Sequence, residues 1–247
     1  MTKEFDVNDL KSLWEGKEFD LASFFPYFQW IAQSLQDIIR YKRREDIAGQ
    51  SVRENDLQHC YKIGLITLLF AIKENESRSQ KDKLDIGLLV IMGITHDISE
   101  IIKGDIAWFE KNASFKDGEY EAFIKIIEPL PNSVREYLTL AFRRVVPDSK
   151  YYLDDKEARF FKGVEQAEHL SRALHECRQG NLHFAPGFIR GQLTILVDVS
   201  KEFPSLIEYV KGFMVELENY EREFEKRRGY YLREYIKRGG KVETFPF

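Results

Sequence analysis

Two histidines and an aspartate are the residues of this sequence best suited to carry chemistry. His96 and Asp97 are adjacent near the end of an apolar segment, and His59 precedes them in another apolar segment. Neutral imidazoles and carboxylates are ligands that divalent transition ions accept in proteins. Because a mononuclear site needs three or four such ligands from different elements, these residues predict a metal site.

The His-Asp pair lies in the segment LDIGLLVIMGITHDISEIIKGDIAW, from Leu84 to Trp108. Burying a carboxylate or a charged imidazole without partners costs several kcal/mol, so this polar cluster requires a hydrogen-bond network or a metal ion. On a regular helix His96 and Glu100 share a face, and Asp97 points about 100° away. Gly104 fits the residue that follows such a helix.

His59 lies in a second helical pattern, RENDLQHCYKIGLITLLFAI. Asn55 or Asp56 fits the N-cap position, and the face through His59 is apolar. His59 is therefore predicted to point inward. An inward histidine alone is more often a satisfied core residue than a ligand. The His-Asp pair farther along the chain is what favours the ligand interpretation.

A fourth ligand is expected from later in the chain. The segment FFKGVEQAEHLSRALHECRQGN offers Glu168, on a face that also carries Phe161. Because a glutamate beside an apolar stripe is commonly only a solvated flank, the residues alone leave both interpretations open. Three histidines near Glu168 in the sequence, His169, His175 and His183, are predicted to be surface imidazoles.

The motifs ENDLQH, from residue 54, and HDISEIIKGD, from residue 96, resemble the HD-domain phosphohydrolases. The pattern of that superfamily is a histidine, then a His-Asp pair, then a distant aspartate. Within it, both motifs are similar to the 5′-deoxynucleotidase branch, which hydrolyses deoxynucleoside 5′-monophosphates. The similarity covers about residues 38–181, more than half of the chain.

The resemblance implies a set of metal ligands. It assigns this role to His59, His96 and Asp97, and it places the fourth ligand of the motif QADxL at Glu168, in QAEHL. The expected cofactor is one divalent ion. Manganese, cobalt, iron, nickel and zinc all accept imidazole and carboxylate ligands, so the ligand set does not select among them.

The resemblance also implies catalytic and substrate-binding residues. Glu100 orients the attacking water or passes a proton to the leaving 5′-oxygen, and Asp105 holds the sugar or assists that transfer. An arginine upstream of the first histidine binds the phosphate, and a count without gaps places it at Arg44. Arg43 and Arg53 are the alternatives for that role.

Three positions depart from the pattern of the branch. Gln58 stands where an acidic residue commonly precedes the first histidine, and Glu168 replaces an aspartate. Glu45 follows Arg44, where the branch has a tryptophan that shapes the deoxyribose pocket. The preference for deoxyribose is therefore expected to be weaker than in the branch.

These residues together predict a metal-dependent phosphohydrolase that removes phosphate from (deoxy)nucleoside 5′-monophosphates. In the expected mechanism the bound ion lowers the pKa of a water ligand from about 15.7 toward about 7. One alternative is a nucleoside triphosphate triphosphohydrolase or another HD phosphatase. The other is a non-catalytic HD domain that binds a nucleotide or a partner. Glu100 and Asp105 favour an enzyme, since a binding domain has little physical need for them.

The elements that position these residues are predicted to be α-helices, because apolar residues recur mostly at three- and four-residue spacing. The expected helices cover roughly residues 21–42, 55–75, 82–102, 119–127, 133–145, 156–178, 190–199 and 204–238. The predicted fold class is all-α, a single HD-domain helical bundle over residues 1–247 with extra N- and C-terminal helices. Its HD-like core covers about residues 38–181, and a C-terminal helical extension covers about residues 190–247.

Composition narrows the partners and the location. With 247 residues, 43% hydrophobic, the chain can bury one large core. A formal net charge of -4 favours a small nucleotide substrate over nucleic acid. Cys60 and Cys177 are expected to be free thiols, and the absence of a signal peptide or a long apolar segment predicts a cytoplasmic protein without membrane contact. The charged last helix packs on the body or on a second subunit, the latter giving a homodimer.

Overall fold

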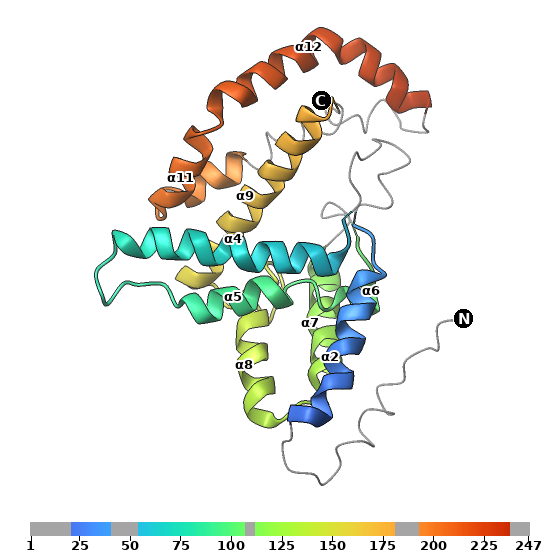
Figure 1. The fold of residues 1–247 in the computed structure, drawn as a ribbon, viewed down its shortest axis with the longest axis vertical. Coiled ribbons are helices and arrows are strands. Elements are labelled where there is room, and N and C mark those ends of the chain that lie inside the picture. Colours follow the sequence, from blue (N-terminus) through green and yellow to red (C-terminus); the bar gives the residue numbers. More distant parts are fainter. Residues whose placement is uncertain (1–20, 41–53, 107–111, 181–192, 238–247) are drawn as a thin grey trace.

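The computed structural model describes residues 21–40, 54–106, 112–180 and 193–237. Regular structure within these ranges is helical apart from one isolated β-bridge, which confirms the all-α prediction. The helices in Figure 1 are α2 (Leu21–Gln36), α4 (Asp56–Glu76), α5 (Ile86–Thr95), α6 (Glu100–Lys103), α7 (Ala113–Ile127), α8 (Asn132–Phe142), α9 (Lys156–Arg178), α11 (Pro204–Lys211) and α12 (Met214–Lys237). None of the described helices is long and apolar enough to cross a membrane.

The expected single helix over residues 82–102 is divided in the structure, because α5 ends at Thr95 and the next four residues form a turn before α6. The Thr95 hydroxyl donates to the carbonyl of Ile91 at 2.7 Å, and Nδ1 of His96 lies 2.9 Å from the carbonyl of Gly93. Such side-chain hydrogen bonds to nearby carbonyls compete with helix continuation. The polar residues of the predicted site thus help to end the apolar helix.

The expected last helix, over residues 204–238, is also divided, into α11 and α12 at Gly212 and Phe213. Apolar residues of both helices, including Leu206 and Phe224, belong to the same buried cluster as residues of α4 and α5. The predicted division into an HD-like core and a C-terminal extension is not tested by this packing and stays a prediction.

Two buried clusters meet at the His-Asp turn. One cluster contains residues of α4, α5, α9, α11 and α12, and the other contains residues of α2, α7 and α8. Met92, before the turn, belongs to the first cluster, and Ile98, within it, belongs to the second. The turn is therefore fixed on both sides by packing. Cys60 and Cys177 are free and buried, as expected.

Helices α4 and α5 lie side by side and approach closely where each carries a glycine (Figure 1). A Cβ atom added at Gly93 would lie 3.0 Å from Cα of Gly64 and 3.2 Å from Cγ2 of Ile63. Backbones can come this close only where the side chain is missing. Since His59 lies on α4 and His96 directly follows α5, this contact sets the separation of the two imidazoles.

The Gly93→Ala substitution is expected to lower the free energy of unfolding by about 1–3 kcal/mol, because the methyl group must displace the α4 backbone. Urea unfolding measures the change. Gly87→Ala, on the same helix, is the matched control: its Cβ would lie 3.4 Å from Asp85 Oδ1, an ordinary contact, and alanine favours a helix over glycine by about 1 kcal/mol. Equal stability of the two variants would show that the close contact does not constrain α4 and α5.

Candidate metal centre

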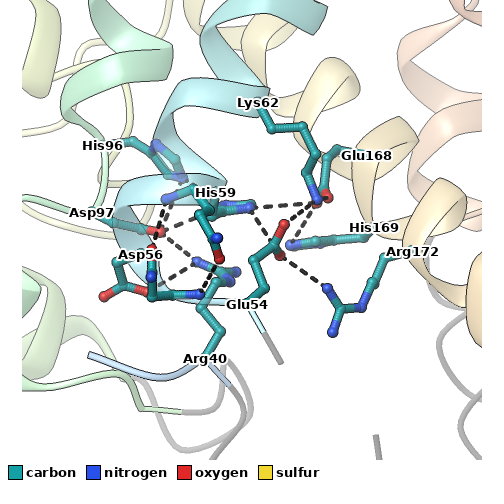
Figure 2. A network of polar contacts seen from close by, with 12 residues as sticks. Arg40, Glu54, Asp56, His59, Lys62, His96, Asp97, Glu168, His169 and Arg172 are labelled. Atoms are coloured by element: carbon teal, nitrogen blue, oxygen red, sulfur yellow. Dashed lines mark hydrogen bonds and ion pairs between the residues drawn. The ribbon is translucent and has the colours of Figure 1, made fainter. Parts of the chain in front are cut away.

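The three sequence-predicted ligands with the strongest motif lie together in the structure (Figure 2). Nε2 of His59 is 3.1 Å from Nε2 of His96 and 3.6 Å from Oδ2 of Asp97, and Nε2 of His96 is 3.2 Å from the same oxygen. Ligand atoms bound about 2.1 Å from one transition ion lie about 3.0–3.4 Å apart. This metal triangle of His59, His96 and Asp97 therefore fits a single divalent ion.

The start of α4 positions His59. Asn55 and Gln58 form a reciprocal capping box, in which the Asn55 side chain accepts from the Gln58 backbone N–H at 2.9 Å. The Gln58 side chain in turn accepts from the Asn55 backbone N–H at 3.2 Å. Gln58, which departs from the family pattern, thus helps to begin the helix that carries His59.

Charges within the triangle suit a cation. Burial, and then the positive charge of Arg40, lowers the pKa of His59 well below its ordinary value, so this imidazole is neutral at neutral pH. Burial also disfavours charged His96, but Asp97 and Cys60 outweigh it and raise the pKa of His96. Burial also disfavours the charged form of Asp97 and so raises its pKa, but the positive charges of His96 and Arg40 outweigh this and hold the pKa of Asp97 well below its ordinary value. A divalent ion that binds here would displace the proton of His96.

Arg40, which no sequence motif marked, lies at the same site. Its Nη1 donates to Oδ2 of Asp97 at 2.5 Å and lies 3.8 Å from Oδ1 of Asp56. The β-bridge between Ile39 and Asn55 holds this part of the chain against the start of α4. The structure thus places one buried guanidinium directly beside the metal triangle.

Arg44, the predicted phosphate ligand, lies outside the described residues, as do its alternatives Arg43 and Arg53. The prediction came from a count without gaps before His59. Arg40 is four positions upstream of Arg44, so a count that allows a gap of four residues before the ENDLQH motif would have reached it.

Three carboxyl groups lie close together at the site, one of them in the metal triangle. Oxygens of Asp56, Asp97 and Glu100 lie within 4.8 Å of one another. Burial, and then the charge of Asp97, raises the pKa of Asp56 to about 7. Asp105, just after Gly104 at φ 73, is partly buried and near enough to raise that pKa further. Both predicted catalytic carboxylates therefore lie near the metal triangle.

Glu168 is buried as the apolar face predicts, but the structure does not bring it into the triangle. Its Oε2 is 3.8 Å from Nδ1 of His59, the ring nitrogen that faces away from the triangle, and its Oε1 forms an ion pair with Lys62. Ligation by Glu168 stays a prediction. His169 is not the surface residue that was expected: it is partly buried, and its ring stacks 6.4 Å from that of His59. His175 is exposed as predicted.

The prediction for His169 was wrong because its neighbours in the chain, Glu168 and Leu170, are both buried on α9, which packs against α4 and α11. His183 lies outside the described residues. Lys62 and Arg172 are further neighbours of the site that were not predicted from the sequence. Helical spacing is the signal that would have found them, because Lys62 lies three residues after His59 and Arg172 lies four residues after Glu168.

Comparisons with known proteins identify a matching family and a similar fold. The sequence matches the family described as YfbR-like, 5′-deoxynucleotidase YfbR-like, over residues 26–226. The fold is similar to the crystal structure of a predicted metal-dependent phosphohydrolase from Magnetospirillum magnetotacticum MS-1, with a TM-score of 0.56 and 20% sequence identity. That likeness covers 81% of this chain and 93% of the other, and at this identity it shows a shared fold. A search of curated proteins finds no match.

Proposed function

Because the chain belongs to the YfbR-like 5′-deoxynucleotidase family, we propose that it removes the phosphate group from deoxynucleoside and nucleoside 5′-monophosphates. The family is one of metal-dependent nucleotide phosphohydrolases, so the substrate is a small nucleotide. The single observation that carries the proposal is the metal triangle, whose three ligand atoms lie 3.1–3.6 Å apart and whose two imidazoles are buried.

In this proposal His59, His96 and Asp97 hold one divalent ion, which is manganese, cobalt, iron, nickel or zinc. The bound ion supplies an activated water for attack on a phosphate ester. Glu168 was predicted to be a fourth ligand. Its carboxylate faces the opposite ring nitrogen of His59, a position from which it supports that imidazole in a fixed orientation.

Glu100 and Asp105 keep their predicted roles in the proposal. A carboxylate oxygen of Glu100 lies within 4.8 Å of one of Asp56, whose pKa of about 7 makes a proton available to this pair near neutral pH. Glu100 can therefore pass a proton to the leaving 5′-oxygen. Asp105, in the loop directly after α6, holds the sugar.

Arg40 takes the phosphate-binding role in the proposal, with Arg44 as the alternative that the sequence count favours. The Arg40 guanidinium already contacts a metal ligand, and a guanidinium pairs well with phosphate oxygens. Arg40 is followed by Tyr41, so an arginine with an aromatic neighbour is present, as in the family. If Arg40 binds the phosphate, the residue that follows the phosphate-binding arginine is the aromatic Tyr41; if Arg44 does, that residue is Glu45. An aromatic residue at this position favours a preference for deoxyribose.

The experiment that tests the proposed function is a panel of nucleoside 5′-mono- and 5′-triphosphates, each with a ribose and a deoxyribose form, assayed with several divalent metals. Inorganic phosphate is expected from the monophosphates. A deoxyribose preference approaching about 10²-fold, the limit for rejecting one hydroxyl in an apolar pocket, would support Arg40 and Tyr41. A much weaker preference would support Arg44 and Glu45.

Other outcomes of the panel select the alternatives. Triphosphate released from the longer substrates would show a triphosphohydrolase, which would need more cationic groups around the substrate. No product from any nucleotide, with metal bound, would indicate a non-catalytic domain. A homodimer and a cytoplasmic location stay predictions. Light scattering of the purified protein tests the first, and fractionation of cells tests the second.

A further inference from the structure

The outward face of α4 is apolar, although it is exposed to solvent. Four side chains on it, those of Tyr61, Leu65, Leu69 and Ile72, are 67%, 46%, 67% and 46% exposed. Their spacings of four, four and three residues place them along one face of the helix. Residues 63–72 include no charged residue, and their only polar side chain, Thr67, is fully buried. A helix that is apolar all round is normally enclosed on every side, so this face is one that a partner would cover.

Helix α5 extends this apolar surface. It runs alongside α4 (Figure 1), and its residues, Ile86–Thr95, also include no charged residue. Ile94 is 44% exposed, and a Cβ atom added at Gly64 would lie 3.0 Å from its Cγ1. Ile94 therefore covers Gly64, the residue directly before Leu65. The α4 stripe is defined as the exposed residues Tyr61, Leu65, Leu69, Ile72 and Ile94.

The charges beside the α4 stripe are already paired within the chain. Lys62 and Lys73 are the two lysines of α4. Nζ of Lys62 lies 2.6 Å from Glu54 and also pairs with Glu168, and Nζ of Lys73 lies 3.1 Å from Glu76. Helices that bind anionic membranes carry a basic face beside the apolar one, and the formal net charge of this chain is -4. A partner for the stripe is therefore expected to present an uncharged apolar surface.

A second copy of this chain presents such a surface. In a two-fold symmetric contact the same patch is used by both copies, and two uncharged stripes meet without like-charge repulsion. A fully exposed side chain of this size offers on the order of 200 Å², and the residues of the stripe are about half exposed. The stripe alone thus offers roughly 500 Å² per copy, which brings a dimer close to the roughly 1,000 Å² in total that a specific interface buries.

We propose that the α4 stripe is the interface of a homodimer, in which it packs against the same stripe of a second copy of this chain. This places the interface on α4 and α5 and not on α12, whose exposed residues are mostly charged. The inference does not rest on the proposed function, because no metal ligand and no phosphate-binding arginine belongs to the stripe.

The test measures the mass of the full chain and its dissociation on dilution. Light scattering is expected to give wild type about twice the chain mass of 29.2 kDa. Analytical ultracentrifugation over a dilution series gives the dimer Kd. Leu69→Glu and Ile72→Glu are each expected to raise this Kd by about 10²-fold or more, because two-fold symmetry puts each new charge into the interface twice.

Val215→Glu is the matched control, because Val215 is a 72% exposed apolar residue on α12 and receives the same charge. Its Kd is expected to stay within about twofold of wild type, as for an ordinary surface substitution. The helical circular dichroism of each variant shows that it folds. The midpoint of thermal unfolding is expected to rise with protein concentration in wild type and in Val215→Glu, but not in the two α4 variants.

Three results would overturn the proposal. The first is a wild type that stays monomeric at every concentration. The second is a dimer whose Kd is unchanged in both α4 variants, and the third is a dimer that only Val215→Glu dissociates, which would place the interface on α12. If a monomeric wild type binds vesicles of equal phosphatidylcholine and phosphatidylglycerol and Leu69→Glu does not, the stripe is a membrane surface and the second copy is excluded.

Discussion

Replacing Asp97 with asparagine is expected to reduce phosphate release from a 5′-monophosphate by about 10³-fold or more. Oδ2 of Asp97 is the one anionic atom of the metal triangle, 3.2 and 3.6 Å from the two imidazole nitrogens. Asparagine has the same shape without the charge, and loss of several kcal/mol of metal-dependent stabilisation corresponds to this decrease. Phosphate release and metal content are both measured, and the helical circular dichroism is expected to be unchanged.

Glu100→Gln is the matched comparison for that variant, because Glu100 is buried next to the triangle without being part of it. It is expected to retain the metal and to lose about 10²–10⁴-fold in rate, as for the loss of one general acid or base. If both variants hydrolysed substrate like wild type, the cluster described here would not be the active site.

Replacing Arg40 with alanine is expected to reduce kcat/KM for a deoxynucleoside 5′-monophosphate by about 10²–10³-fold, because a substrate dianion would lose its nearest charge-assisted donor. Steady-state kinetics with the preferred metal give this ratio. Arg40→Lys keeps the charge but not the planar pair of donors, so only a partial recovery is expected. Since Arg40 also pairs with Asp97, the metal content of each variant is measured as well.

The decisive comparison for this second prediction is Arg44→Ala, which tests the position that the count without gaps selects. A small effect at Arg44 and a large effect at Arg40, at equal metal content, would assign phosphate binding to Arg40. The reverse result would restore Arg44. An Arg40→Ala variant that only loses its metal would show that Arg40 serves the structure of the site and not the substrate.

Local sequence signals were enough to predict much of this site. The N-cap, predicted at Asn55 or Asp56 and found at Asn55, and the inward direction of His59 follow from residue types within one helical turn. The same holds for Gly104, whose φ of 73 is the left-handed conformation that glycine adopts easily. These features depend on residues that are close in the chain, so the pattern of apolar and polar residues is enough to predict them.

Features that depend on contacts between distant elements were not predicted. The turn at the His-Asp pair arises from side-chain hydrogen bonds of Thr95 and His96 that compete with those of the helix. The helical spacing of apolar residues continues through the turn, so the sequence pattern did not indicate it. Lys62 and Glu168 meet across α4 and α9, and no spacing within either segment indicates the other. Arg40 lies beside the β-bridge between Ile39 and Asn55, and a count of positions before His59 does not detect such a contact between two segments.

The central claim, that His59, His96 and Asp97 bind a divalent metal ion, is tested most directly by elemental analysis of the purified protein. About one transition ion per chain is expected in wild type, either as purified or after incubation with manganese, cobalt or zinc, and none is expected in Asp97→Asn. Absence of metal from wild type under all these conditions, with thermal stability unchanged by each ion, would contradict it.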